Sequence, residues 1–243
     1  MGLTAVIVSH GQPSDPDPAE AALAALARQV GDFLPGWRIR SATLAKTGAL
    51  DAAIGGEATG LVYPMFMAGG WFPMVELPRR MKEVGGAEWA YLPPFGLDAG
   101  VQALALSLTL QAAAALAQSP RDTPVLLAAH GSFRSSAPAQ VAHAVAGQLR
   151  RAGFARTEAY FIDQEPRIAT AKTYDARSVC LPFFAAEGGH VADDLPGALA
   201  EAGFPGLVLP PIGLHPSVPG LIAAALREAG PLVAQDGVNS HPA

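Results

Sequence analysis

Short apolar runs rich in β-branched residues alternate along the chain with segments in which apolar side chains recur at helical spacing. The short runs predict strands at residues 4–8, 38–44, 60–64, 89–92, 125–129, 156–162, 178–182 and 207–210. The helical pattern covers residues 19–34, 48–54, 78–84, 98–117, 135–152, 165–174, 195–202 and 217–228. Regular βα alternation predicts parallel sheets with helices on both faces, because parallel strands need a crossover connection.

The pattern occurs twice, with anchors separated by 117 to 120 residues. The matching positions are His10 and His130, Pro64 and Pro182, Leu77-Pro78 and Leu195-Pro196, and Leu92–Gly96 and Leu209–Gly213. A period this long indicates a duplicated domain rather than a solenoid. We therefore predict two tandem flavodoxin-like units, each a four-stranded parallel sheet with helices on both faces, at residues 1–120 and 121–232. Residues 233–243 are predicted to form a flexible tail.

Composition narrows the class of protein. With 243 residues, of which 50% are hydrophobic and 15% charged, the chain can bury a large core. A single cysteine, Cys180, excludes an intramolecular disulfide, and no apolar run is long enough for a membrane span. The net charge of -5, without a Lys/Arg cluster, argues against a nucleic-acid partner. We expect a soluble cytoplasmic protein.

Two histidines in the second copy follow strands that should be neighbours. His130 ends the first strand of that copy, and His190 lies just beyond the third. Ligands of doubly wound sheets bind at the carboxyl ends of the strands, at the switch point between those two strands. Either histidine alone is more typical of a structural residue, but the pair favours a site. Imidazoles bind Fe²⁺, Co²⁺ and Ni²⁺ and transfer protons near neutral pH.

Three acidic residues accompany the second histidine, namely Glu187, Asp193 and Asp194. Pro196 places the start of a helix within a residue or two of Asp194, so residues 187–193 are predicted to form a mobile loop over the site. The carboxylates would attract a cation, or Asp193 and Asp194 would only cap the helix. No glycine-rich phosphate loop is present, which argues against a nucleotide cofactor.

The second copy resembles a known family. Its motifs Ala129-His130-Gly131-Ser132, Pro182-Phe183-Phe184, Gly189-His190-Val191 and Pro210-Pro211-Ile212-Gly213 are similar to those of the class II tetrapyrrole chelatases, in particular the sirohydrochlorin cobaltochelatase/ferrochelatase group. The resemblance implies a chelatase-like fold and a lyase activity, the ATP-independent insertion of Co²⁺ or Fe²⁺ into sirohydrochlorin or a related tetrapyrrole, for cobalamin or sirohaem biosynthesis. The divalent metal (Co²⁺, Fe²⁺ or Ni²⁺) would be a substrate, with no permanently bound cofactor.

The resemblance also implies roles for individual residues. His130 and His190 would bind the metal and accept the pyrrole protons, with Glu187, Asp193 and Asp194 as further candidate metal ligands. The macrocycle would lie in the cleft between the units of a monomer or weak homodimer. Contacts with it are expected from residues in or next to the matching motifs, namely Ser132, Phe133, Phe183 and Gly189.

The first copy departs from the family pattern. It keeps His10, but the aligned loop reads Gly70-Trp71-Phe72-Pro73, with tryptophan at or beside the position of the second histidine. One site per chain is therefore expected, with His10 structural or peripheral. Trp71 would provide a flat apolar wall for the tetrapyrrole or would pack in the core.

Two alternative functions are open at this point. A non-catalytic tetrapyrrole or metal carrier would share these residues without turnover. A phosphatase with His130 as nucleophile requires an arginine immediately before the histidine, and Ala129 occupies that position.

Overall fold

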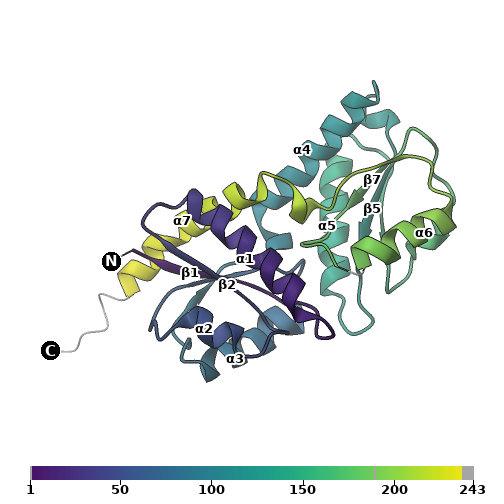
Figure 1. The fold of residues 1–243 in the computed structure, drawn as a ribbon. Coiled ribbons are helices and arrows are strands. Elements are labelled where there is room, and N and C mark those ends of the chain that lie inside the picture. Colours follow the sequence, from purple (N-terminus) through teal and green to yellow (C-terminus); the bar gives the residue numbers. More distant parts are fainter. Residues whose placement is uncertain (1, 189, 237–243) are drawn as a thin grey trace. The chain divides into compact units, whose positions relative to one another are not determined.

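The computed structural model describes residues 2–188 and 190–236, and their side chains apart from those of residues 190 and 232–236. In this part of the chain, eight strands form two separate four-stranded sheets, with orders β2-β1-β3-β4 and β6-β5-β7-β8 (Figure 1). All neighbouring strands are parallel, so both predicted sheets are confirmed. The strands are β1 (Thr4–Ser9), β2 (Arg38–Thr43), β3 (Leu61–Pro64), β4 (Ala90–Tyr91), β5 (Val125–Ala129), β6 (Thr157–Phe161), β7 (Val179–Pro182) and β8 (Leu207–Val208).

The central strands are apolar throughout because helices cover both of their faces. Every residue of β5 and of β7 is buried, as are the first five residues of β1. The edge strands β4 and β8 have only two residues each, all of them exposed. Short edge strands offer little backbone for pairing with another chain.

Helices α1 (Pro16–Asp32) and α7 (Val218–Asp236) cover one face of the first sheet, and α2 (Ala49–Ile54) and α3 (Leu77–Glu83) cover the other (Figure 1). The layer beneath α2 and α3 is built mainly from large apolar side chains, among them Val8, Ile54, Leu77, Met81 and Trp89. Burial of this surface is the main source of stability for the unit.

In the second unit, α4 (Ala99–Ala115) and α5 (Ala137–Arg151) cover one face of the sheet. The other face packs against α6 (Leu195–Ala202) and a 3₁₀ turn, Ile168–Thr170. Among the described helices, none combines the length and apolar character needed to cross a membrane.

The helices at the ends of the two copies are exchanged. The chain divides into compact units of Met1–Asp98 with Pro216–Ala243, and Ala99–His215, rather than at residue 120. Helix α4 closes the first sequence copy but packs on β7 and α5, whereas α7 closes the second copy but packs on β3 and α1. The apolar side chains of α4 are distributed evenly around the helix. Its sequence therefore does not indicate which of the two sheets it covers. The predicted tail also begins later, because α7 continues to Asp236; residues 237–243 lie outside the described residues.

One predicted helix, at residues 165–174, is wrong. Only the 3₁₀ turn Ile168–Thr170 forms there, and the preceding backbone bonds back to β6, since the Phe161 N–H donates to Pro166 O. Ile168, Ala171 and Tyr174 are buried in the core. Their spacing of three residues matches one face of a helix, but it is satisfied here by an irregular segment anchored at its apolar side chains.

Candidate functional site

His130 immediately follows β5, at the carboxyl edge of the second sheet. Strand β5 lies between β6 and β7, so His130 stands at the switch point of the strand order. Gly131 has φ +75°, and a Cβ there would lie 2.6 Å from Cγ of Gln164. Glycine is therefore required for the turn that directs the chain away from His130.

The His130 ring is oriented by two acceptors. Its Nδ1 lies 3.1 Å from the Gly131 carbonyl oxygen and 3.4 Å from Oδ2 of Asp163. Neither oxygen carries a hydrogen when the carboxyl is ionised, so Nδ1 is the protonated nitrogen and the lone pair of the neutral ring is on Nε2. Histidines that ligate metals are held in the same way, with the second ring nitrogen donating to a carbonyl or carboxylate. The side chain is 39% exposed and therefore accessible to a ligand.

Sequence reasoning missed Asp163. It lies two residues beyond β6, and its N–H donates to the His130 carbonyl at 2.9 Å. The corresponding residue of the first copy is Ala45, whose N–H donates to the His10 carbonyl at the same distance. An alignment of the two copies would have revealed an acid that appears only beside the histidine of the second copy.

The predicted loop over the site is partly helical. Residues His190–Asp194 form a π-helical turn that continues into α6, and the first copy has an equivalent turn, Phe72–Glu76, before α3. In the first copy the Leu77 N–H bonds back to the Phe72 carbonyl, just before Pro78. A widened turn accommodates a proline whose ring would clash with the carbonyl four residues earlier. Gly189 and the His190 side chain lie outside the described residues.

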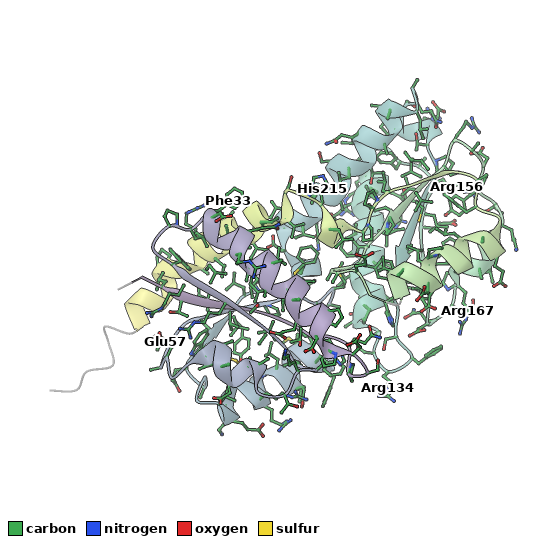
Figure 2. All side chains as sticks on the ribbon, in the orientation of Figure 1. Phe33, Glu57, Arg134, Arg156, Arg167 and His215 are labelled. Atoms are coloured by element: carbon green, nitrogen blue, oxygen red, sulfur yellow. The ribbon has the colours of Figure 1, made fainter. Side chains whose placement is uncertain are left out.

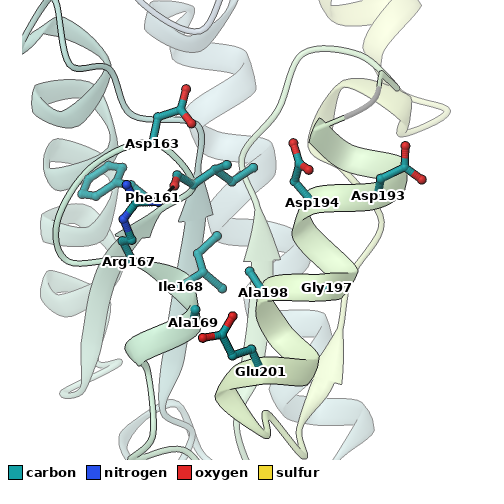
Figure 3. Close-up of a pocket in the computed structure, with 11 residues that line it drawn as sticks. Phe161, Asp163, Arg167, Ile168, Ala169, Asp193, Asp194, Gly197, Ala198 and Glu201 are labelled. Atoms are coloured by element: carbon teal, nitrogen blue, oxygen red, sulfur yellow. Dashed lines mark hydrogen bonds between the residues drawn. The ribbon is translucent and has the colours of Figure 1, made fainter.

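Asp194 does not cap α6 through its side chain. Asp194 makes no side-chain capping hydrogen bond, and it and Asp193 are exposed on the π-helical turn. Both line a cavity of about 430 Å³ in the second unit, together with Asp163 (Figure 3). Asp163 and Arg167 form one wall, and Asp193, Asp194 and Glu201 form the other (Figure 3). Glu187, which is exposed, is not part of this lining.

In the first copy, arginines stand at the positions equivalent to two residues of the cavity lining. There, Glu76 is only 4% exposed and accepts hydrogen bonds from Arg79 and Arg80, and Arg80 also donates to the Leu44 carbonyl. The bonds from Arg79 and Arg80 lower the pKa of Glu76 to about 2. In the second copy, 118 residues later, the two arginines are replaced by Gly197 and Ala198. Loss of these side chains leaves room between α6 and the end of β6.

The residues predicted to contact substrate have different environments. The Ser132 N–H donates to Oε1 of Gln164, and its hydroxyl accepts the Arg134 N–H. Phe133, at 74% exposure, is fully available to a ligand. Phe183 is 2% exposed and packs in the core, so its prediction as a substrate contact is wrong. It follows a buried strand directly and continues the apolar run of that strand.

In the first copy an aromatic pair replaces the second histidine. The His10 Nδ1–H donates to the Gly11 carbonyl at 2.8 Å, and the ring meets that of Phe72 edge-on at 4.2 Å between centroids. Phe72 begins the π-helical turn, as His190 does in the second copy, and Trp71 aligns with Gly189. Trp71 is 57% exposed, so the alternative that it packs in the core is wrong. Among the side chains that the structure describes, which exclude that of His190, no three metal-ligating groups converge.

Comparison with known proteins finds a family and solved structures that share this architecture. The CbiX family model matches residues 124–229. A solved structure of CbiX, the terminal enzyme for biosynthesis of siroheme in denitrifying bacteria, is 46% identical over 93% of this chain and 99% of its own, with a TM-score of 0.86. No curated protein matches the chain.

Two more distant structures share the fold. SirB from Bacillus subtilis with Fe³⁺ is 16% identical, with a TM-score of 0.71 over 98% of both chains. The sirohydrochlorin chelatase SirB from Bacillus subtilis subspecies spizizenii, in complex with cobalt, is 15% identical, with a TM-score of 0.64 over 99% of this chain and 98% of its own. The duplicated parallel sheets, with a histidine at the switch point, are the architecture of class II tetrapyrrole chelatases. Within that class, the chain belongs to the CbiX family.

Proposed function

We propose that this chain is an ATP-independent chelatase that inserts Fe²⁺ into sirohydrochlorin to form sirohaem. The observation that carries the proposal is the environment of His130, whose Nδ1–H is held by Gly131 and Asp163, so that the ring lone pair is on Nε2. The choice of iron is supported by the 46% identical CbiX, which acts in siroheme biosynthesis.

His130 and His190 act as a pair in this proposal. Support comes from the first copy, where His10 and Phe72 occupy the equivalent positions and their ring centroids are 4.2 Å apart. Two imidazoles at that separation can ligate one metal ion together, or can receive protons from one face of a macrocycle. The same edge-on contact with phenylalanine in place of histidine offers neither function.

The reaction exchanges one metal ion for two protons. The histidines hold the partly dehydrated Fe²⁺, the two pyrrole N–H groups lose their protons as the four macrocycle nitrogens bind the metal, and the vacated imidazoles accept those protons. Catalysis of this kind needs no covalent intermediate, because binding that favours the distorted macrocycle lowers the barrier. Asp163 orients His130, and Glu187, Asp193 and Asp194 attract the cation. Ser132, Phe133, Gly189 and Trp71 contact the macrocycle.

Cobalt is the second candidate metal, with cobalamin as the end product. A SirB structure holds cobalt, and sites with nitrogen and oxygen ligands bind Fe²⁺, Co²⁺ and Ni²⁺ in a common order of affinity. Anaerobic titration of the enzyme and sirohydrochlorin with each metal, followed by absorbance, will give the three insertion rates. A non-catalytic carrier would bind both substrates stoichiometrically without insertion above the uncatalysed rate. We further propose a cytoplasmic monomer or weak homodimer, which fractionation and sedimentation test.

Substitution of the histidines tests the mechanism. Both His130→Ala and His190→Ala are expected to reduce the rate of iron insertion by about 100-fold or more, as for loss of a proton acceptor. His10→Ala is the matched control, because it removes the equivalent ring from the copy without a histidine pair, and it is expected to keep most of the activity. Full activity in His190→Ala, or loss only in His10→Ala, would contradict the proposal.

A further inference from the structure

Two arginines and one phenylalanine border the candidate site of the second unit. Phe133 is three residues beyond His130, and at 74% it has the greatest exposure among the large hydrophobic side chains in the described part of the chain. Arg134 is also exposed and follows it directly. Arg167 lies in the cavity wall beside Asp163, and both arginines project from the surface of the second unit (Figures 2 and 3). We call these three residues the arginine rim.

The rim is held together by contacts of its own. The guanidinium carbon of Arg167 lies 5.8 Å from the centre of the Phe133 ring, within the range of a cation–π interaction. One nitrogen of the same group donates to the Ile162 carbonyl at 3.1 Å, and Nε lies 3.6 Å from Oε1 of Glu165. The Arg134 N–H donates to the Ser132 hydroxyl at 3.1 Å. Within the described residues, the Arg134 guanidinium has no hydrogen-bond or ion-pair partner, so it is available to an anion.

The first copy has no such rim. Its equivalent positions, 120 residues before Phe133 and Arg134 and 118 before Arg167, are Pro13, Ser14 and Ala49. A requirement of the fold would apply equally to both copies, since their sheets have the same strand order. The phenyl ring and both guanidinium groups instead accompany the copy that keeps two histidines. The rim is therefore associated with the chemistry of that copy rather than with its folding.

We propose that Arg134 and Arg167 bind the peripheral carboxylates of the tetrapyrrole, with the Phe133 ring against the edge of the macrocycle. This inference rests on the proposed function and specifies how its substrate is recognised. Sirohydrochlorin carries acetate and propionate groups around its edge, and an arginine binds a carboxylate through two parallel hydrogen bonds. The acids Asp163, Asp193 and Asp194 repel these carboxylates and attract the metal. The arrangement therefore directs the anionic substrate to the rim and the cation to the acidic walls.

Steady-state kinetics of Arg134→Gln, Arg167→Gln and the double variant test the rim. Each single change is expected to raise KM for sirohydrochlorin by about three- to tenfold with kcat little changed, because an exposed charged contact contributes modestly to binding. The control is Arg151→Gln, which should leave KM unchanged. It removes the same charge from an exposed position at the C-terminal end of α5, whereas Arg134 lies just before the N-terminal end. Arg167→Lys, compared by thermal melting, separates loss of charge from loss of the contact with Ile162.

The metal-free complex provides an independent readout. Spectroscopic titration with sirohydrochlorin alone should give a weaker Kd for the double variant, and added NaCl should weaken binding to the wild-type protein more than to the double variant. Unchanged KM and Kd in a folded double variant would overturn the proposal that the arginine rim binds the tetrapyrrole. Failure of the wild-type protein to insert metal would contradict the proposed function instead, and the metal-free titration would still decide whether the rim binds the macrocycle.

Discussion

At the scale of single residues, the most consequential difference between the copies is Asp163 in place of Ala45. His10 and His130 each donate from Nδ1 to the carbonyl of the following glycine, but only His130 also has a carboxylate oxygen 3.4 Å from that nitrogen. The carbonyl alone fixes the tautomer. The carboxylate adds a second, charged acceptor for the Nδ1–H, which strengthens the hydrogen bonding that orients the ring.

Asp163→Asn should therefore reduce kcat/KM for metal insertion by about 10- to 100-fold, as is typical when the outer partner of a ligating histidine is lost. The asparagine keeps the size of the side chain but not its charge. Glu201→Gln is the control, because Glu201 lines the same cavity without a contact to His130. An equal loss of activity in both variants would indicate that total cavity charge, and not orientation of His130, is what matters.

Single residues were predicted unevenly from the sequence. The position of His130 could be predicted because it ends an apolar strand in a motif that occurs twice. Asp163 was missed because it follows β6, which lies on the other side of β5 from the strand that precedes His190. Phe183 was predicted to contact substrate because it lies in a motif that resembles the chelatases, but the first residues after a buried strand can still belong to the core.

At the scale of elements, the π-helical turns before α3 and α6 are the feature that sequence patterns did not reveal. The prolines of Leu77-Pro78 and Leu195-Pro196 correctly marked the start of each α-helix. A turn with bonds between residues five apart leaves no distinct side-chain signature, so the residues before each proline were predicted as loop. The helix predicted at residues 165–174 is wrong for the opposite reason: the apolar residues there are spaced as in a helix, but the segment is irregular.

The first of these turns carries a pH-sensitive contact. Hydrogen bonds from Arg79 and Arg80 lower the pKa of Glu76 from 4.5 to about 2. A carboxyl whose pKa is lower in the folded state stabilises that state above pH 4.5, and this contribution is lost as the pH falls from 4.5 towards 2. Urea unfolding between pH 6 and pH 2.5 should show a smaller dependence on pH for Glu76→Gln than for the wild-type protein. Glu83→Gln, at an exposed partner of Arg79, is the control, and equal curves for Glu76→Gln and wild type would contradict the assignment.

At the scale of the whole molecule, the two copies are linked by exchange of their last helices. The duplication was evident from the sequence because strand-end motifs such as Leu92–Gly96 and Leu209–Gly213 recur at a nearly constant distance. The exchange was not evident, because both sheets present an apolar face to a covering helix and α4 is apolar on all sides. Sequence periodicity identifies a helix and its buried surface, but not which of two similar sheets it covers.

Removal of residues 216–243 should therefore destabilise the first unit and not the second. All three tryptophans, Trp37, Trp71 and Trp89, belong to the first unit, and a Cβ at Gly230 of α7 would lie 3.0 Å from the Trp37 ring. We expect a red shift of tryptophan emission in the truncated protein, with part of the helical circular dichroism retained. A chain ending at Asp236 is the control. Unshifted emission after loss of α7 would contradict the division into units.

The exchange also sets an order of events at the ribosome. The second unit is one uninterrupted stretch, Ala99–His215, whereas the first needs both Met1–Asp98 and the segment after His215. Domains generally fold as units while synthesis proceeds from the N-terminus. The unit that carries His130 can therefore be complete before the chain is released. In the half that is translated first, β3 and α1 stay uncovered until α7 emerges.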